Sequence, residues 1–130
     1  MNTVQIIAFT HRQFNFDEIG LFHLDDKQRI DVLTNLKTNL DIDELMYLST
    51  CNRVEFIISH EKKITKTFVE RLIKYLLANQ LPPNLKDIVD RAEIINNKAA
   101  VHHIFSVASS IDSLVVGERE IITQVRKAFE

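Results

Sequence analysis

Four stretches of the chain have the hydrophobic patterns of β-strands. Residues 4–10 are rich in β-branched and aromatic side chains and predict an opening strand. Residues 45–48 are hydrophobic throughout, which predicts a strand buried on both faces. Residues 54–59 predict a half-buried strand, because Val54, Phe56 and Ile58 alternate with Glu55, Ile57 and Ser59. Residues 92–96 predict the last strand.

Apolar residues at helical spacing predict the helices between these strands. A short helical piece is expected near residues 16–22, and Asp25 or Asp26 can cap a second helix. That second helix has apolar residues at Ile30, Leu33, Leu36 and Leu40. A longer amphipathic helix is predicted from Ile64 to Gln80, ended by Pro82-Pro83, and a short helical turn follows at residues 85–89.

Two more helices are predicted in the C-terminal part of the sequence. One begins with Asn97 as its cap, and the other resumes at Arg119 after the break at Gly117. His102 and His103 lie off the apolar stripe of the first, so we expect each to be solvent-exposed or directed towards a site. The second meets no stop signal before the sequence ends, so we expect a domain cut from a longer protein.

These elements predict one α+β domain over residues 1–130. We expect a mostly antiparallel sheet of about four strands, packed with helices and built from βαβ-like units. With 45% hydrophobic and 26% charged residues, the composition is that of a soluble globular protein. No apolar run approaches about 20 residues and the start lacks a basic region, so neither a membrane span nor a signal peptide is expected.

The numbers of cysteines, charged residues and glycines limit which metals, cofactors and partners the chain can bind. One cysteine permits neither an internal disulfide nor a cysteine-based zinc site; we expect no metal and a reducing, cytoplasmic setting. A net charge of −2 gives no sign of a DNA partner, although it leaves RNA open. Two glycines can build neither a Rossmann fingerprint nor a P-loop, so any nucleotide cofactor must be held elsewhere.

The sequence Ser-Thr-Cys-Asn-Arg at residues 49–53 is the strongest candidate for chemistry. It contains the only cysteine, Cys51, and is expected to connect the second and third strands. Arg53 follows two residues later, and a nearby guanidinium favours thiolate over thiol, which suits a nucleophile. A buried, inert cysteine is the alternative, because free cysteine is among the most buried residue types. The polar neighbours Ser49, Thr50 and Asn52 favour function.

Two segments resemble the glutamyl-tRNA reductase family. Ser-Thr-Cys-Asn-Arg-Val-Glu at residues 49–55 resembles the family's Ser-Thr-Cys-Asn-Arg-Thr-Glu signature, and residues 103–118 resemble its second block. The order and spacing of the two blocks agree, and the likeness covers essentially the whole chain. It implies the N-terminal catalytic domain, truncated before the NADPH-binding and dimerisation domains.

The resemblance implies an oxidoreductase of tetrapyrrole biosynthesis. The Cys51 thiolate would attack the aminoacyl ester of glutamyl-tRNA, and NADPH, bound by a domain absent from this chain, would reduce the thioester to glutamate-1-semialdehyde. His103 would be a catalytic residue and the enzyme a homodimer through its missing part. Substrate contacts would come from Thr50, Asn52, Arg53, Ser113, Glu118, Arg119, Glu120 and Gln124.

Two other functions remain open from the sequence. One is a cysteine-dependent hydrolase or acyltransferase that uses Cys51 and His103 without reduction. The other is a non-catalytic α+β binding module in which Cys51 is structural.

Overall fold

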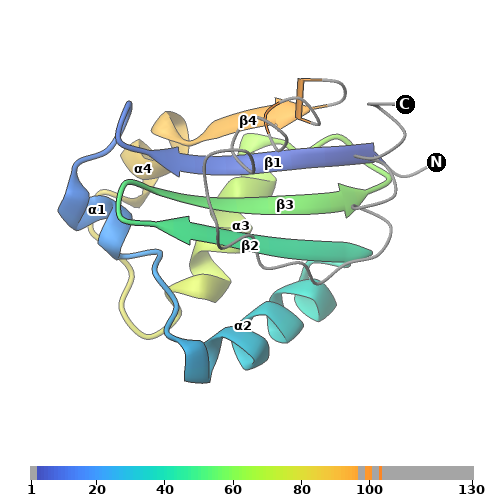
Figure 1. Ribbon diagram of the computed structural model, residues 1–130, viewed down its shortest axis with the longest axis horizontal. Helices are drawn as coiled ribbons and strands as arrows, with labels where there is room; N and C mark the ends of the chain where they lie inside the picture. Colours follow the sequence, from blue (N-terminus) through green and yellow to red (C-terminus); the bar gives the residue numbers. More distant parts are fainter. Residues whose placement is uncertain (1–2, 97–98, 101–102, 104–130) are drawn as a thin grey trace.

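A single antiparallel sheet of four strands forms the centre of the described structure (Figure 1). The computed structural model describes residues 3–96, 99, 100 and 103. The strand order is β2-β3-β1-β4, with bounds that confirm all four predicted strands: β1 (Thr3–Thr10), β2 (Glu44–Thr50), β3 (Arg53–His60) and β4 (Glu93–Asn96). No helix in these residues is long and apolar enough to span a membrane.

The helices connect the strands into two interlocked units. The first runs from β1 through α1 (Phe16–Gly20) and α2 (Asp26–Asn39) to β2, and the second from β3 through α3 (Lys66–Leu76) and α4 (Leu85–Arg91) to β4. Strand β3 lies between β1 and β2, and β1 lies between β3 and β4; all three pairings are antiparallel. Each unit is therefore a split βαβ, the ferredoxin-like arrangement. The predicted α+β class with βαβ-like units is confirmed.

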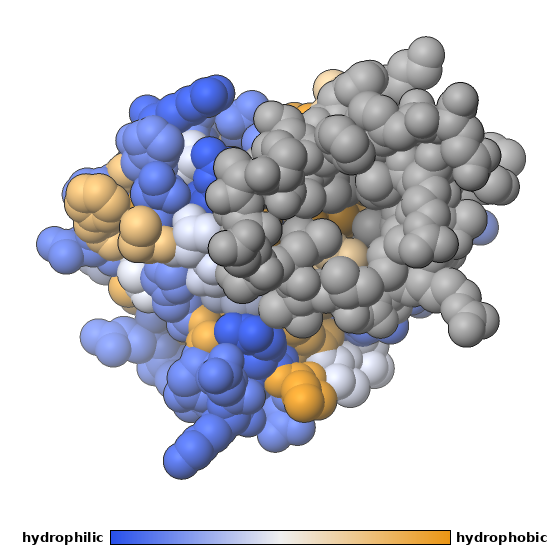
Figure 2. Space-filling view, viewed as in Figure 1, coloured by the Kyte–Doolittle hydropathy of each residue, from blue (hydrophilic) through white to orange (hydrophobic). Residues whose placement is uncertain are grey.

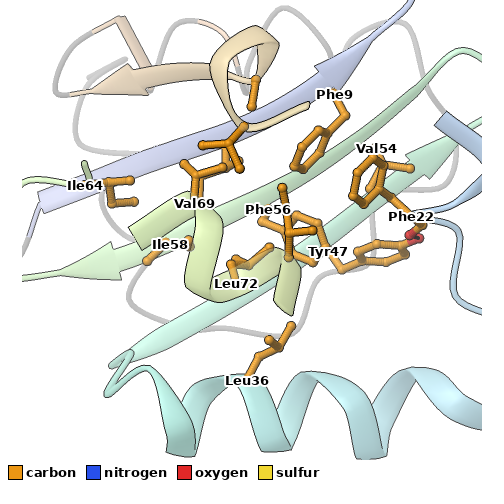
Figure 3. Close-up of a cluster of buried hydrophobic side chains, with 14 of the residues drawn as sticks. Phe9, Phe22, Leu36, Tyr47, Val54, Phe56, Ile58, Ile64, Val69 and Leu72 are labelled. Atoms are coloured by element: carbon orange, nitrogen blue, oxygen red, sulfur yellow. Dashed lines mark hydrogen bonds between the residues drawn. The ribbon is translucent and has the colours of Figure 1, made fainter. Parts of the chain in front are cut away.

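The main core lies between one face of the sheet and the helices (Figure 3). The rings of Phe9 and Phe22 stack with centroids 4.0 Å apart, and Phe56 meets Phe9 edge-on at 6.3 Å. Helix α3 contributes Val69 and Leu72 to this core, as its predicted stripe requires. Burying each such side chain contributes about 1.5–3 kcal/mol, and this face holds the larger of the two apolar clusters among the described residues.

The predicted end of the longer helix is wrong. Helix α3 ends at Leu76, before the prolines, because Leu77 leaves helical geometry (φ −109°, ψ 32°) and a turn follows. In α2, Asp25 is the cap, one of the two candidates that the sequence offered, and Ile30 of the apolar set is 74% exposed. Ile30 lies roughly 100° around the helix from Leu36 and Leu40, which face the core. Accordingly, Figure 2 shows mostly hydrophilic side chains over α2, with isolated hydrophobic groups.

Strand β3 is buried on both faces, and the prediction of a half-buried strand is wrong. Glu55, Ile57 and Ser59 are buried as completely as the residues that alternate with them. The reason is a second, smaller apolar cluster on the other face of the sheet, where Met46, Leu48 and Ile57 pack with Val4, Ile6, Ala8 and Ala100. Because β3 also has a strand on each side, its central residues are enclosed on all sides.

An ion pair joins α4 to α1 beside the β2–β3 hairpin. The Arg91 guanidinium donates from Nη1 to Glu18 Oε1 (3.0 Å) and from Nη2 to Glu18 Oε2 (2.5 Å). It also donates to the Gln13 carbonyl and lies over the Phe14 ring. The hydrogen bonds from Arg91, with a further one from the Asn15 backbone, lower the pKa of Glu18 from 4.5 to about 2.

The Glu18 ion pair predicts a specific loss of stability in acid. Because its folded-state pKa lies below the unfolded value, the pair stabilises the chain above about pH 4.5, and this contribution disappears as pH falls towards about 2. Glu18→Gln should therefore lower the free energy of unfolding at pH 7 by about 1–2 kcal/mol, allowing for solvent screening. Urea unfolding should show wild type and variant converging near pH 2.

The matched control is Glu70→Gln, which removes an exposed carboxylate paired with Lys74 at 3.3 Å within α3. Exposed pairs of this kind contribute little, so the control should follow wild type at every pH. A constant difference between Glu18→Gln and wild type from pH 7 to pH 2 would contradict the assignment.

Candidate functional site

Cys51 lies at the tip of the β2–β3 hairpin and is exposed to solvent. The connection consists of two residues, Cys51 and Asn52, rather than the predicted five, because Thr50, the last residue of β2, already pairs with Arg53, the first residue of β3. The primed turns that usually close such hairpins need positive φ, which neither loop residue has. Contacts hold the loop instead: the Thr50 hydroxyl donates to Asn52 Oδ1 (2.9 Å), and the His11 amide donates to the Asn52 carbonyl (3.0 Å).

Arg53 and His103 both meet one buried carboxylate, that of Glu55. Arg53 Nη1 lies 3.9 Å from Glu55 Oε1, an ion-pair distance that is too long for a hydrogen bond. His103 Nε2 is hydrogen-bonded to the same oxygen. Glu55 is 1% exposed, while the side chains of Arg53 and His103 are 19% and 27% exposed. The structure therefore brings two predicted site residues, about 50 positions apart in sequence, to one face of the sheet.

Glu55 was not among the residues that the sequence singled out for the site. It belongs to the Ser49–Glu55 signature, but its place in an alternating strand assigned it to a solvent-facing side. A signal was present, because Ile57 occupies the same side of β3 and an isoleucine there indicates a covered face. A carboxylate in a strand with two covered faces is a candidate for a functional role, since burying it is costly.

A second contact at this end of the sheet was also missed. His23 Nδ1 lies 2.5 Å from Ser49 Oγ, on the face opposite Glu55. The position of His23 follows from Tyr47, whose hydroxyl donates to the Phe22 carbonyl and accepts from the Leu24 amide. This tyrosine therefore fixes the loop between α1 and α2 against β2. Figure 1 shows α1 beside the hairpin end of the sheet.

The rest of the predicted site is outside the described residues. These predicted contacts are Ser113, Glu118, Arg119, Glu120 and Gln124. Among the described residues, no group of three or more metal-binding side chains could hold a metal ion.

An open cavity of about 490 Å³ lies at the other end of β3, lined by residues that include His60, Lys62, Phe68 and Arg71. It contains none of the predicted site residues.

The fold and the hairpin together define a ferredoxin-like α+β domain that presents an exposed cysteine at a hairpin tip, with partly exposed Arg53 and His103 side chains meeting the buried carboxylate of Glu55 on the following strand. Residues 7–130 match the family model described as glutamyl-tRNAGlu reductase, N-terminal domain. The chain belongs to this family, which confirms the resemblance found in its sequence.

Individual relatives agree over nearly the whole chain. The glutamyl-tRNA reductase of a Nitratiruptor species is 38% identical over 128 residues, covering 96% of this chain and 28% of the relative. That of Campylobacter jejuni subsp. jejuni is 36% identical over 125 residues, covering 95% and 28%. The structure of glutamyl-tRNA reductase from Methanopyrus kandleri matches with a TM-score of 0.57 at 26% identity, covering 99% of this chain and 28% of that one. The chain thus spans less than a third of the length of these relatives.

The exposure of Cys51 predicts rapid alkylation. Because the thiol lies at a hairpin tip, iodoacetamide near pH 7 should modify the folded chain at least as fast as the urea-unfolded chain. Intact-mass spectrometry would follow the reaction, with Cys51→Ser as the blank because the chain has one cysteine. Strong protection in the folded state would instead support a buried, structural cysteine.

Proposed function

We propose that this chain is the acyl-accepting part of a glutamyl-tRNA reductase, an enzyme of tetrapyrrole biosynthesis. The observation that carries the proposal is the exposed Cys51 at the tip of the hairpin whose second strand carries Arg53 and Glu55, the residue that His103 contacts. A rigid hairpin can hold a nucleophile in place while leaving it open to a macromolecular substrate. We further propose that the whole enzyme is cytoplasmic and forms a homodimer through regions outside this chain.

The proposed step is transfer of the glutamyl group from tRNA to sulfur. Cys51 Sγ forms a bond to the ester carbonyl carbon, and the bond from that carbon to the terminal ribose oxygen breaks. The thiol proton ends on the departing ribose oxygen, so tRNA leaves as an alcohol and a thioester remains. No electrons are exchanged in this step, and a thioester accepts hydride more readily than the ester it replaces.

Arg53 supports recognition of the glutamyl side chain. Its guanidinium carries five N–H donors, and its contact with Glu55 at 3.9 Å is not a hydrogen bond. It is two residues from Cys51, so it can form a bidentate pair with a substrate carboxylate while the carbonyl carbon lies at the sulfur. Thr50 and Asn52 brace the loop through their mutual hydrogen bond and offer further polar atoms beside it.

Reduction of the thioester to glutamate-1-semialdehyde needs a hydride, which the resemblance assigns to NADPH. The described residues do not fit that cofactor. Gly20 ends α1 with no positive φ, so no glycine-rich turn there brings backbone amides against a pyrophosphate. We therefore propose that NADPH binds outside this chain. His103 is proposed as the group that moves the thiol proton during acyl transfer.

Mass spectrometry tests the proposal directly. After mixing with glutamyl-tRNA, the wild-type chain should gain the mass of one glutamyl group on the Cys51 peptide. Cys51→Ser should gain none, because a serine hydroxyl is protonated near pH 7 and is a far weaker nucleophile. Slow hydrolysis should release free glutamate, and adding NADPH should yield no semialdehyde. A glutamyl group on another residue, or an unmodified wild-type chain under conditions where it is folded, would contradict the proposal.

Arg53→Lys tests substrate recognition more sharply than Arg53→Ala, since it keeps the charge and removes the fork. Losing a hydrogen bond to a charged group should slow Cys51 acylation by roughly 10- to 150-fold, or about 1.5–3 kcal/mol. The preference for glutamyl-tRNA over glutaminyl-tRNA should fall as well. A slower variant with unchanged preference would show that Arg53 does not recognise the glutamyl carboxylate.

A further inference from the structure

Glu55 is a buried carboxylate in the middle of the sheet. Its neighbours across the sheet are Leu48 on β2 and Ala8 on β1, and both are buried and apolar. Neither adjoining strand therefore places a polar side chain directly opposite it. The nearest polar residues on those strands, Thr10 and Thr50, are one diagonal position away, and their hydroxyls donate to Gln13 and Asn52. The partners that the structure describes come from elsewhere: Arg53, two positions earlier on the same face of β3, and His103, from a distant part of the sequence.

Burial at 1% exposure is costly for a carboxylate unless it is paired and hydrogen-bonded. An apolar residue at position 55 would suit the surrounding cluster of Met46, Leu48 and Ile57 better for stability alone. We therefore look to the contacts of Glu55 for the reason that a carboxylate occupies this position. Those contacts are with Arg53 and His103, two residues that the proposed acyl transfer uses.

The contact with Glu55 selects one form of the His103 ring. The structure places Nε2, not Nδ1, at Glu55 Oε1. Because an ionised carboxylate can only accept, we infer that Nε2 carries the proton and donates it to this oxygen. In the neutral ring the other nitrogen, Nδ1, is then an acceptor. A carboxylate that orients a histidine in this way fixes its tautomer and also stabilises the ring once it has taken up a proton.

We propose that Glu55 is a positioning residue of this site. It holds His103 with its proton on Nε2 and its basic nitrogen at Nδ1, and it keeps the Arg53 guanidinium at the hairpin end of β3. This role rests on the proposed function of Cys51 as the acyl acceptor. Glu55 itself does not touch the reacting atoms.

A purely structural role for Glu55 would have different consequences. Replacing it would then change stability without changing the tautomer of His103 or the reactivity of Cys51 in molecules that are folded. Glu44 provides the matched control, because it is another buried carboxylate on the same face of the sheet. Its cross-strand neighbour in the β2–β3 ladder is Ser59, which lies near the end of β3 that is farther from Arg53.

The test compares wild type, Glu55→Gln and Glu44→Gln in the 130-residue chain. Nitrogen NMR of chain labelled in its five histidines reports which ring nitrogen carries the proton, and His103→Asn identifies the signal of His103. Wild type and Glu44→Gln should show the proton of neutral His103 on Nε2. Glu55→Gln should show a mixture of both tautomers, since an amide can accept from or donate to the ring.

Acylation of Cys51 by glutamyl-tRNA, followed by intact mass, provides the second readout. Glu55→Gln should be roughly 10- to 100-fold slower than wild type, the range seen when a carboxylate that orients a metal-binding histidine is replaced. Glu44→Gln should match wild type. Circular dichroism establishes that each variant is folded before its rate is compared.

The possible failures are distinguishable. A proton on Nδ1 of wild-type His103 would overturn the positioning role without any variant, even if Glu55→Gln failed to fold. Wild-type rate and tautomer in Glu55→Gln would overturn it as well. If the wild-type chain were not acylated at all, the proposed function would fail, and the positioning role, which rests on it, would fall with it. The observed tautomer of His103 would then be a feature of the folded structure with no link to acyl transfer.

Discussion

The burial of β3 on both faces is the constraint on which the rest of the structure depends. One face of this central strand packs Val54, Phe56 and Ile58 into the main core, and the other packs Ile57 into the second cluster. The register of a strand enclosed in this way is strongly specified, because a slip by one residue would exchange the residues on its two faces. The packing of β3 therefore fixes the position of its first residue, Arg53, and of the loop that precedes it.

Contacts around the hairpin extend this rigidity to its tip. The Thr50 hydroxyl and the His11 amide both hold Asn52, and the Tyr47 hydroxyl fixes the loop that follows α1. The pairing of Arg91 with Glu18 ties α4 to α1 at the same end. A two-residue loop without positive φ gains little from its own turn geometry, so these neighbours position Cys51. The sheet itself thus acts as the support for an exposed thiol.

Much of this could be predicted from the sequence, because local patterns carry it. The four strands, a cap for α2 at Asp25 or Asp26 and the buried stripe of α3 follow from local sequence patterns that need no tertiary information. The second covered face could not be read this way, since the apolar cluster on that face joins Ile57 to residues distant in sequence, Ala100 among them. The same limit hid the convergence of Arg53 and His103, which only folding brings to one carboxylate. The end of α3 was misplaced because Leu77 leaves the helix ahead of the prolines that were expected to end it.

The central claim is that the hairpin presents Cys51 so that a glutamyl group on sulfur meets Arg53. The most direct measurement is a crystal structure of the chain after Cys51 has reacted with the chloromethyl ketone of glutamate, which leaves a glutamyl group attached through a stable thioether. The account predicts that the side-chain carboxylate of that group accepts two hydrogen bonds from the Arg53 guanidinium, with the Glu55–His103 contact intact. A glutamyl side chain directed away from Arg53, with its carboxylate in solvent or on another residue, would contradict it.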